Sequence, residues 1–418
     1  MKYVSKLFQP IITIPRNAKI KNTEITCKSQ KLLLECGMIR PTASGFFSVL
    51  PLARRSLDKL ENIIKSCMES VGAQRLSLPS LTASKLWQST GRLTDVGPEL
   101  MKLEDRHGKQ YLLSPTHEEA IADLLADVGP LSYKQLPLLL YQITNKYRDE
   151  HRPKHGLLRA REFLMCDVYG AHGNEECARR VYDDVTEGYR EVFRRLGLDV
   201  YRVQAPTGEM GGSLSHEWQL PTSAGEDTVK ICDSCGHVTL TGGDKCDKCG
   251  GTVTDRNSIE VGHTFLLGTK YSQPLNANYA PDNKPIYMSC YGIGITRLLA
   301  ASLEALSSET ALKWPKAIAP YKAIIIGPKE GSKEWQAHGP DKLEALYQSI
   351  ASLPGLKHDV IVDDRHHMTI GKRLLMAEKM GYPAIIVCGR GCVTSQYELR
   401  IPGNEPSLLH TEELHQQV

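Results

Sequence analysis

Residues 145 to 167 constrain the fold most strongly, because two extended runs flank a loop rich in basic residues. Alternation along a strand places on one face of the first run Gln142, Thr144, Lys146, Arg148 and Glu150, and on the other Tyr141, Ile143 and Tyr147. The return run places on a common face Arg159, Arg161, Phe163, Met165 and Asp167. The segment is therefore expected to form an antiparallel pair of strands with one polar face and one face in the core.

The polar face of this strand pair has the groups that bind a nucleotide. Guanidinium groups bind phosphate through paired hydrogen bonds, and the ring of Phe163 can stack on a base. We expect Arg148 to hold an α-phosphate and Glu150 to contact the amino group of adenine, which makes the pair a candidate ATP site. A surface hairpin with solvated charges is the alternative interpretation.

The chain has ample length for a large core in two or three domains. Its 418 residues are 41% hydrophobic and 24% charged, as in ordinary globular proteins. The net charge of +3 excludes a generally polycationic protein, so RNA binding would depend on local patches. No run approaches the roughly 18 apolar residues of a membrane span. Twelve cysteines, four of them with metal spacing, indicate a reducing compartment rather than a secreted disulfide scaffold.

The first 25 residues form a basic segment. Before Glu24 there is no acid, and the cations are Lys2, Lys6, Arg16, Lys19 and Lys21. This bias is expected of a mitochondrial transit peptide. Pro10 and Pro15 would interrupt an amphipathic helix, so an ordinary basic tail is an equal alternative.

Residues 51 to 71 have the apolar periodicity of a helix. Its stripe, closed by Gly72, consists of Leu57, Leu60, Ile64, Cys67 and Val71. A short extended segment ending at Pro79 follows. Taken alone, such a helix and strand are usual core elements.

The run LLSPTHEEAIADLLAD places Thr116 and Glu118 on either side of His117, just before a helical pattern that begins near Glu119. A carboxylate and a hydroxyl group at such a bend can accept the protons of an amino-acid ammonium group. The alternative is a helix cap, since threonine followed by glutamates is usual at a helix start.

The run MSCYGIGITRLLAASLEAL leads through Gly292 and Gly294 into a helix with Arg297 in its first turn. Glycines permit close approach of the backbone, a helix N-terminus favours anions, and Arg297 adds a planar cation, so a phosphate has a physical basis here. By itself this pattern has low specificity, and its spacing is not that of the dinucleotide fingerprint.

Together these segments resemble the three motifs of class II aminoacyl-tRNA synthetases. Motif 1 is similar to residues 51 to 79, motif 3 to the run around Arg297, and motif 2 to Tyr147, Arg148, Glu150, Arg161 and Phe163. From about Thr26 to the C-terminus the chain resembles bacterial-type prolyl-tRNA synthetases, through the strings PTHEE, GRLTDVGPEL, SYKQLP, REFLMCD, GGSLSHEW, GHTFLLGTKYS and CYGIGITR.

The resemblance implies a catalytic α+β domain over residues 26–315, with an antiparallel sheet flanked by helices, and a homodimer formed through motif 1. It implies ATP with Mg²⁺ as a substrate, Arg148 and Arg297 as catalytic groups, and an ATP site of Arg148, Glu150, Arg161, Phe163, Gly292, Gly294 and Arg297. Proline would be held by Thr116 and Glu118, with Cys290 lining its pocket and His263 and His216 nearby.

Residues 226–259 depart from the bacterial pattern, in which a large inserted domain hydrolyses mischarged alanyl-tRNA. About thirty residues occupy that place, too few for a hydrolytic domain of ordinary size. Editing in cis is therefore expected to be absent. The truncation resembles the mitochondrial enzymes, and with the basic N-terminus it favours the mitochondrial matrix over the cytoplasm.

The same residues contain CDSCGHVTLTGGDKCDKCGG, with two CxxC pairs formed by Cys232, Cys235, Cys246 and Cys249. Four thiolates in a segment too small for its own core predict a closed structural zinc site. Redox-active pairs and a decayed site are the alternatives. His237 is expected to be a bystander, because four cysteines complete the coordination.

Residues 321–418 alternate predicted strands and helices, which indicates a small α/β domain with a largely parallel sheet. It resembles the anticodon-binding domain of several class II synthetases. Asp363, Asp364 and Arg365 follow a predicted strand, where they would contact bases of tRNA(Pro) or lie in a solvated loop.

The expected function is therefore the ligation of proline to tRNA(Pro) through prolyl-adenylate. One rival is a catalytically silent synthetase-like protein that binds RNA or serves as an accessory subunit, against which the complete set of motif residues counts. Another is a sister synthetase for threonine, serine, glycine or histidine, against which the PTHEE and SHEW strings count.

Overall fold

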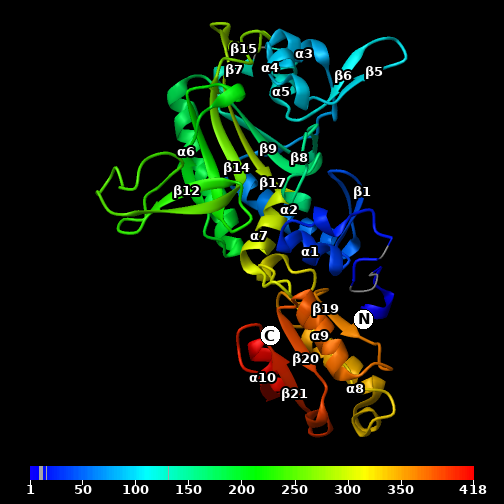
Figure 1. Ribbon diagram of the computed structural model, residues 1–418. Coiled ribbons are helices and arrows are strands. Elements are labelled where there is room, and N and C mark those ends of the chain that lie inside the picture. Colours follow the sequence, from blue (N-terminus) through cyan, green and yellow to red (C-terminus); the bar gives the residue numbers. More distant parts are fainter. Residues whose placement is uncertain (9–12, 16, 130) are drawn as a thin grey trace.

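A large antiparallel sheet forms the centre of the larger domain in the computed structural model, which describes residues 1–8, 13–15, 17–129 and 131–418 (Figure 1). Its strand order is β10-β11-β14-β17-β9-β8-β3, with only the short β3 pairing parallel. The strands are β3 (Gln74–Arg75), β8 (Leu138–Tyr147), β9 (Glu162–His172), β10 (Tyr201–Gln204), β11 (Leu214–Pro221), β14 (Val253–Gly268) and β17 (Tyr287–Gly294).

Helices cover one face of this sheet and enclose the main core. They are α1 (Lys28–Glu35), α2 (Pro51–Ser70), α6 (Glu175–Leu196) and α7 (Ile295–Leu306), accompanied by the hairpin of β1 (Ile39–Ala43) and β2 (Phe46–Val49). The amphipathic α6 buries Tyr189 and Phe193 against Trp218 of the sheet, while α7 buries Leu298 and Leu299. These contacts confirm the expected antiparallel sheet flanked by helices.

A smaller layer covers the end of the sheet that is uppermost in Figure 1. It contains α3 (Ser84–Ser89), α4 (Arg92–Asp95), α5 (Glu118–Asp127), β4 (Leu81–Ala83), β5 (Lys102–Glu104) and β6 (Gln110–Leu113), together with β7 (Leu131–Ser132), β15 (Asn278–Ala280) and β16 (Lys284–Pro285). The short 3-10 helices of the chain are η1 (Val4–Lys6), η2 (Asn22–Glu24), η3 (Gly97–Glu99), η4 (Tyr133–Gln135), η5 (Gly156–Leu158), η6 (Gly208–Met210), η7 (Lys316–Ile318) and η8 (Arg390–Thr394).

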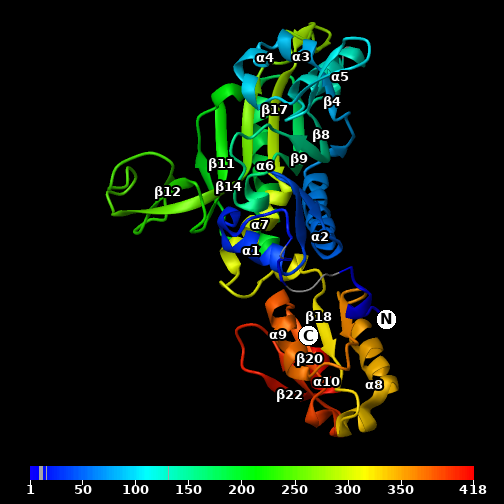
Figure 2. The same ribbon diagram turned by 45° about the vertical axis from the view of Figure 1, so that its right-hand side comes forward.

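The cysteine-rich segment forms an arm that projects from the sheet (Figure 1, Figure 2). Its strands are β12 (Asp227–Cys232) and β13 (Val238–Thr239), and β12 pairs with the first part of β14 from Ser258 to Val253. Because β14 continues into the central sheet, the arm is a direct extension of that sheet.

The C-terminal domain has its own sheet of order β19-β18-β20-β21-β22. Its elements are β18 (Ala323–Ile326), α8 (Lys333–Ala351), β19 (Val360–Asp363), α9 (Ile370–Met380), β20 (Ala384–Val387), β21 (Gln396–Arg400), β22 (Ser407–His410) and α10 (Thr411–Gln417). The first three strands are parallel and the last two antiparallel, as expected. α8 begins at Lys333 and bends at Gly339 and Pro340.

The N-terminal residues lie against the C-terminal domain. Tyr3 forms a parallel bridge with Val362 of β19, and the amide of Val362 donates to the carbonyl of Lys2 at 2.9 Å. Two residues of the basic segment that the transit-peptide prediction weighed, Pro10 and Arg16, lie outside the described residues.

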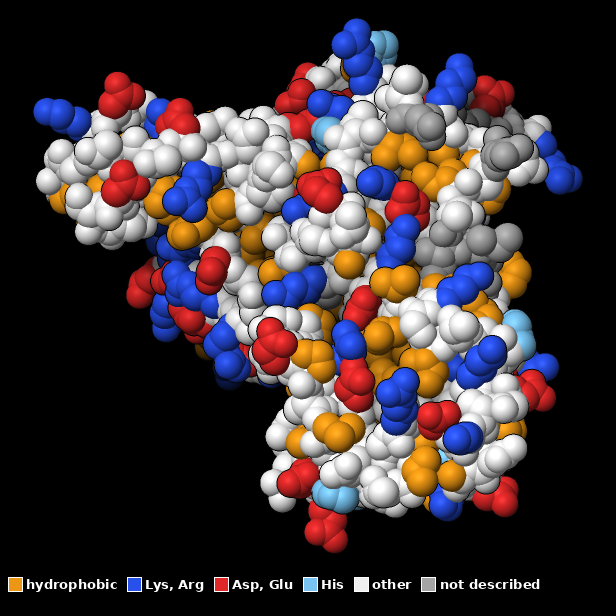
Figure 3. All heavy atoms as spheres, turned by 60° about the horizontal axis from the view of Figure 1, so that its bottom comes forward, with side chains coloured by type: hydrophobic (Ala, Val, Ile, Leu, Met, Phe, Trp, Pro, Cys, Tyr) orange, Lys and Arg blue, Asp and Glu red, His pale blue; other side chains and the backbone are white. Residues whose placement is uncertain are grey.

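Two features of the surface bear on the expected function. On the face shown in Figure 3, Lys/Arg and Asp/Glu side chains are interspersed rather than gathered by sign, in line with the small net charge. Within the described ranges, no helix combines the length and apolar character that crossing a membrane requires.

Candidate active site

A cavity of ≈ 380 Å³ lies on the face of the central sheet opposite the large helices. β9 contributes Phe163, Met165 and Asp167 to its lining, whereas the intervening Cys166 and Val168 are buried in the helix-covered core. The alternation predicted for this strand is therefore observed, and it separates the chemical face of the sheet from the core face.

Arg148 and Arg297 line this cavity together. The guanidinium carbon of Arg148 lies 5.2 Å from the centroid of the Phe163 ring, and burial together with the charge of Arg297 lowers the pKa of Arg148. Arg297 is held by the carbonyls of Leu158 at 2.9 Å and Glu260 at 3.2 Å. Two cations that line the same cavity repel each other, and an anionic ligand bound there would stabilise both.

Glu260 offsets part of this positive charge. Its carboxylate accepts a hydrogen bond from Nδ1 of His263 at 2.9 Å and lies 3.8 Å from Nη1 of Arg297. Burial opposes ionisation of Glu260, but the His263 hydrogen bond and the charges of Arg297 and Arg148 outweigh burial and hold its pKa below the ordinary value. A β-bulge at Val261 turns Glu260 toward the same side as His263, although the two are three residues apart on one strand.

Thr116 and Glu118 lie at the start of α5 and also line the cavity. The Thr116 hydroxyl group donates to the Glu118 carboxylate at 2.6 Å, and Nη1 of Arg92 lies 3.6 Å from that carboxylate. Glu118 is almost fully buried, so its free acceptor sites favour a cationic donor group from a ligand. The thiol of Cys290 lines the same cavity, and burial followed by the Glu118 charge raises its pKa.

A buried network of polar side chains on β8 and β9 supports the Thr116–Glu118 bend. The phenol of Tyr169 accepts from the amide of His117 at 2.9 Å and donates to Asp167 at 2.7 Å. Asp167 also accepts from Gln142 at 2.9 Å and pairs with Nζ of Lys146 at 2.6 Å. All five residues are under a tenth exposed, so β8 and β9 hold the bend through fully desolvated polar contacts.

Gly292 and Gly294 bring the end of β17 against the cavity. A Cβ atom at Gly292 would lie 2.1 Å from Cε of Met165, which occupies the space that a side chain would need. Gly294 is the N-cap of α7, with Arg297 in the first turn as predicted.

Of the residues predicted to bind ATP or proline, three do not line the cavity. Glu150 lines an adjoining hollow of ≈ 230 Å³, where it accepts from Nε of Arg159 at 2.9 Å. Arg161 donates to the Glu150 carbonyl at 2.9 Å. His216 lies on the helix-covered face, with Nδ1 2.7 Å from the Tyr182 hydroxyl group. His263, by contrast, faces the cavity.

Asp363, Asp364 and Arg365 lie far along the chain, at the end of β19 in the C-terminal domain. Arg365 pairs with Asp363 through Nη2 at 2.5 Å, and Asp364 accepts from the amide of Ser5 at 2.9 Å. Asp364 and Arg365 are partly exposed away from the cavity, whereas Asp363 is fully buried and serves as the partner of Arg365 rather than as a group open to bases.

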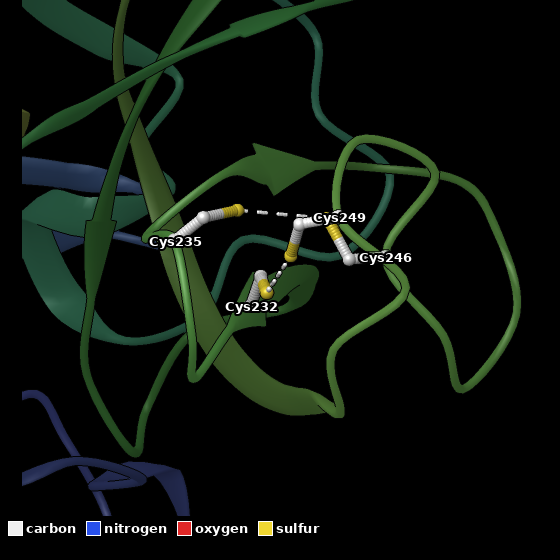
Figure 4. A group of neighbouring side chains, drawn as sticks. All are labelled: Cys232, Cys235, Cys246 and Cys249. Atoms are coloured by element: carbon white, nitrogen blue, oxygen red, sulfur yellow. Dashed lines mark hydrogen bonds between the residues drawn. The ribbon is translucent and has the colours of Figure 1, made fainter.

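The four cysteines of the arm converge on one point (Figure 4). Their Sγ atoms all lie within 4.8 Å of one another, with Cys232 to Cys249 at 3.5 Å and Cys235 to Cys246 at 3.7 Å. A tetrahedral zinc with bonds of about 2.3 Å separates its sulfur ligands by about 3.8 Å, so this donor set fits zinc. His237 instead lies 3.3 Å from Asp247.

Arg92 and Glu260 are two of the charged cavity residues that sequence reasoning missed. Arg92 is buried, pairs with Glu119 at 3.1 Å and lies 4.4 Å from the Trp87 ring. A lone arginine in a short helix has no pattern that marks it, although it lies in the string GRLTDVGPEL. Regular strand alternation would put Glu260 and His263 on opposite faces. The bulge that brings them to one face cannot be recognised in a single sequence, so Glu260 was missed.

Comparisons with known proteins bear on this cavity. Residues 101–306 match the family described as tRNA synthetase class II core domain (G, H, P, S and T). The chain is similar to two proteins named probable mitochondrial proline--tRNA ligase. It is 44% identical over 403 residues to the one from Rattus norvegicus, covering 93% of this chain and 84% of the relative, and 47% identical over 379 residues to the one from Homo sapiens, covering 88% and 79%.

A solved structure has the same fold. The prolyl-tRNA synthetase of Giardia lamblia in complex with prolyl-adenylate aligns with a TM-score of 0.78 at 20% identity, covering 93% of this chain and 75% of that chain.

Proposed function

This chain belongs to the proline--tRNA ligases, a family of class II aminoacyl-tRNA synthetases, and we propose that it activates proline with ATP and transfers it to tRNA(Pro). One observation carries the proposal. A single cavity holds two arginines suited to phosphate, and a threonine beside a buried glutamate suited to a cationic amino group.

The first step joins proline to the α-phosphate. A carboxylate oxygen of proline forms a bond to the α-phosphorus. The bond between the α-phosphorus and the oxygen that bridges to the β-phosphate breaks, and pyrophosphate leaves. In the second step the terminal ribose hydroxyl group of tRNA attacks the prolyl carbonyl, and AMP leaves. Neither step needs a protein nucleophile, so alignment and charge stabilisation supply the catalysis.

Each cavity residue has a role in this scheme. Thr116 and Glu118 accept the protons of the proline imino group, and the neutral thiol of Cys290 lines the ring pocket with His263 nearby. Arg148 stabilises charge on the α-phosphate, and Arg297 binds the departing phosphates. Mg²⁺ enters with ATP and neutralises phosphate charge.

The adenine end of ATP uses the neighbouring residues. Phe163 stacks on the base, Gly292 and Gly294 allow close approach, and Glu150 reads the amino group. Because Glu150 and Arg161 lie beside the cavity, their roles require loop 148–161 to close on ATP. His216 would act through the sheet rather than by contact with proline.

Exchange of pyrophosphate into ATP with each amino acid tests this function without tRNA. Arg148→Ala should lose about 3 kcal/mol of transition-state stabilisation, on the order of 100-fold in rate. Arg148→Lys keeps the charge but loses the planar fork, and should recover only part of the rate. Arg152→Ala, an exposed arginine in the same loop, is the matched control. If the folded wild-type protein shows no pyrophosphate exchange with proline or any other amino acid, the accessory-subunit rival would be favoured.

The enzyme is also proposed to lack editing in cis. Residues 226–259 form only the cysteine arm and leave no room for a hydrolytic domain. A hydrophobic pocket separates substrates that differ by a methylene or two by roughly 10- to 200-fold. We expect slow activation of alanine and stable alanyl-tRNA(Pro). Absence of alanyl-adenylate, or rapid deacylation of alanyl-tRNA by the purified enzyme, would contradict this.

The arm is proposed to hold one structural zinc. Metal analysis of the purified chain should find one zinc per chain, and Cys246→Ser should abolish it. Cys177→Ser, a thiol outside the cluster, is the control. A metal-free wild type in which all four arm cysteines are free thiols would favour the decayed site. Two disulfides among these cysteines would favour the redox pairs.

The remaining features follow the family. We propose that the chain acts in the mitochondrial matrix as a homodimer, with α2 at the dimer interface and Asp363, Asp364 and Arg365 near the anticodon. Light scattering at low concentration tests the dimer. Cell fractionation tests the location, with the cytoplasm as the alternative.

Arg365→Ala should weaken aminoacylation of tRNA(Pro) without a change in pyrophosphate exchange.

A further inference from the structure

Asp359 joins the two domains through charge. Its carboxylate, one tenth exposed, lies just before β19 and receives two cations from α2 of the larger domain. Nη2 of Arg55 lies 2.5 Å from Oδ1, and Nζ of Lys59 lies 2.8 Å from the same oxygen. Arg55 and Lys59 occupy successive turns, so one face of α2 is aimed at this carboxylate.

The same two cations bind the backbone around the domain connection. Arg55 donates to the carbonyls of Pro320 at 2.5 Å and His358 at 2.6 Å, and Lys59 donates to that of Ala319 at 2.6 Å. The Arg55 guanidinium carbon also lies 4.5 Å from the Tyr321 ring centroid. Ile324 and Ile385 of the C-terminal domain also pack in the core that contains Leu52 of α2, and the fixed donors on carbonyl and carboxylate groups add a directional contact to this apolar one.

The far end of α2 touches the strand that carries the catalytic arginine. Glu69, in the last turn, accepts from the Tyr141 hydroxyl group at 2.9 Å. Tyr141 lies on β8, which ends at Tyr147 next to Arg148. A continuous helix of 20 residues therefore connects Asp359 to the catalytic strand.

We propose that Arg55, Lys59 and Asp359 form a clamp that positions the tRNA-binding domain relative to the active site. The inference rests on the proposed function, because only a substrate that spans both domains requires it. Contacts between the C-terminal domain and the tRNA anticodon favour the reaction only when the 3′ end of the same tRNA reaches the cavity at the same time. A freely hinged domain would have to be ordered at each binding event, and that ordering weakens binding.

Two variants break the clamp and one serves as a matched control. Asp359→Asn and Arg55→Gln each remove one charge across the domain boundary. Arg54→Gln removes the neighbouring charge on the same helix, where the pairs of Arg54 with described residues lie within α2, with Asp58 at 2.6 Å and with Glu61. Pyrophosphate exchange with proline should stay within about two-fold of wild type in all three.

Aminoacylation should separate the variants. For Asp359→Asn and Arg55→Gln we expect kcat/KM for tRNA(Pro) to fall on the order of 10-fold, chiefly through KM, and the double variant to lose no more than either single variant. Arg54→Gln should leave it unchanged. Asp359→Glu, which keeps the charge, should recover part of the loss.

Three results would overturn the clamp. Unchanged aminoacylation in both variants would show that domain orientation does not depend on it. A parallel fall in exchange and aminoacylation would show a general structural defect, as would additive losses in the double variant. Where Arg55→Gln does not fold, Arg55→Lys tests the same contacts more mildly. Wild-type protein without proline-dependent exchange would instead refute the proposed function itself.

Discussion

The direction and the size of the side chains at the cavity depend on the residues packed next to them. Glu260 reaches Arg297 only because the bulge at Val261 turns it, and Gly292 is small because Met165 lies across it. Changes of a single methyl or hydroxyl group in these places should therefore alter substrate binding while the fold is kept.

Gly292→Ala tests the space beside Met165. The new Cβ would displace the flexible end of the Met165 side chain, 2.1 Å away, into the cavity. We expect a higher KM for ATP in pyrophosphate exchange and nearly unchanged thermal stability. Gly173→Ala, where nothing lies within 4 Å of the added carbon, is the control. An unchanged KM for ATP would place the nucleotide elsewhere.

Tyr169→Phe tests the support under the Thr116–Glu118 bend, the proposed proline site. The amide of His117 would lose its buried acceptor, at a cost of about 1–3 kcal/mol. Because this amide lies between Thr116 and Glu118, KM for proline should rise more than KM for ATP. Tyr279→Phe removes a phenol that donates to the Gly173 carbonyl at 2.9 Å, outside the cavity lining, and should lower the melting temperature without that selective effect. Equal changes in both KM values would argue against a role at the proline end.

Elements far apart in the sequence meet at the loop between β8 and β9. Glu226, just before β12 of the cysteine arm, pairs with Lys154, with Arg159 at 2.9 Å and with His155 at 3.6 Å. The arm therefore touches the loop that carries the predicted ATP residues. This contact gives the four-cysteine cluster a structural connection to the candidate active site.

Glu226→Gln should loosen that loop. Exposed ion pairs contribute about 0.2–1 kcal/mol each, so overall stability should change little. Hydrogen exchange in residues 150–159 should become faster, and chelation of the arm metal should have the same effect. Glu175→Gln, which breaks an exposed pair within α6, should leave the loop unchanged. Unaltered exchange in the loop would show that Glu226 does not restrain it.

Across the whole molecule, the N-terminal residues complete the C-terminal sheet. Tyr3 pairs along the outer side of β19, Val4 is buried in the main core, and Ser5 bonds to Asp364. An edge strand without such cover has free backbone donors and acceptors and pairs with other chains.

A chain without residues 1–8 tests this cover. We expect a lower melting temperature and more self-association in light scattering, because the edge of β19 becomes exposed. Ser5→Ala, which removes only the side-chain bond to Asp364, should behave almost as wild type. A truncated chain as stable and as well dispersed as the full one would show that the N-terminal pairing adds nothing. Sequencing the mature N-terminus from cells would show whether processing removes these residues.

The sequence by itself determined the elements and the chemical types at the site. Alternation along β8 and β9, the apolar stripe of α2 and the paired cysteines are local patterns whose period or spacing follows directly from backbone geometry. Strand alternation points to Arg148, a glycine-rich helix start to Arg297, and the bend before a helix to Thr116 and Glu118, and these four meet in one cavity.

Only the tertiary structure decided which faces and partners these residues obtained. The bulge that turns Glu260, the burial of Arg92 over Trp87 and the position of His216 beneath α6 depend on contacts between segments distant in the chain. The same holds for the Arg55 and Lys59 contacts with Asp359. A sequence pattern describes one element, whereas burial and charge pairing depend on every element packed around it.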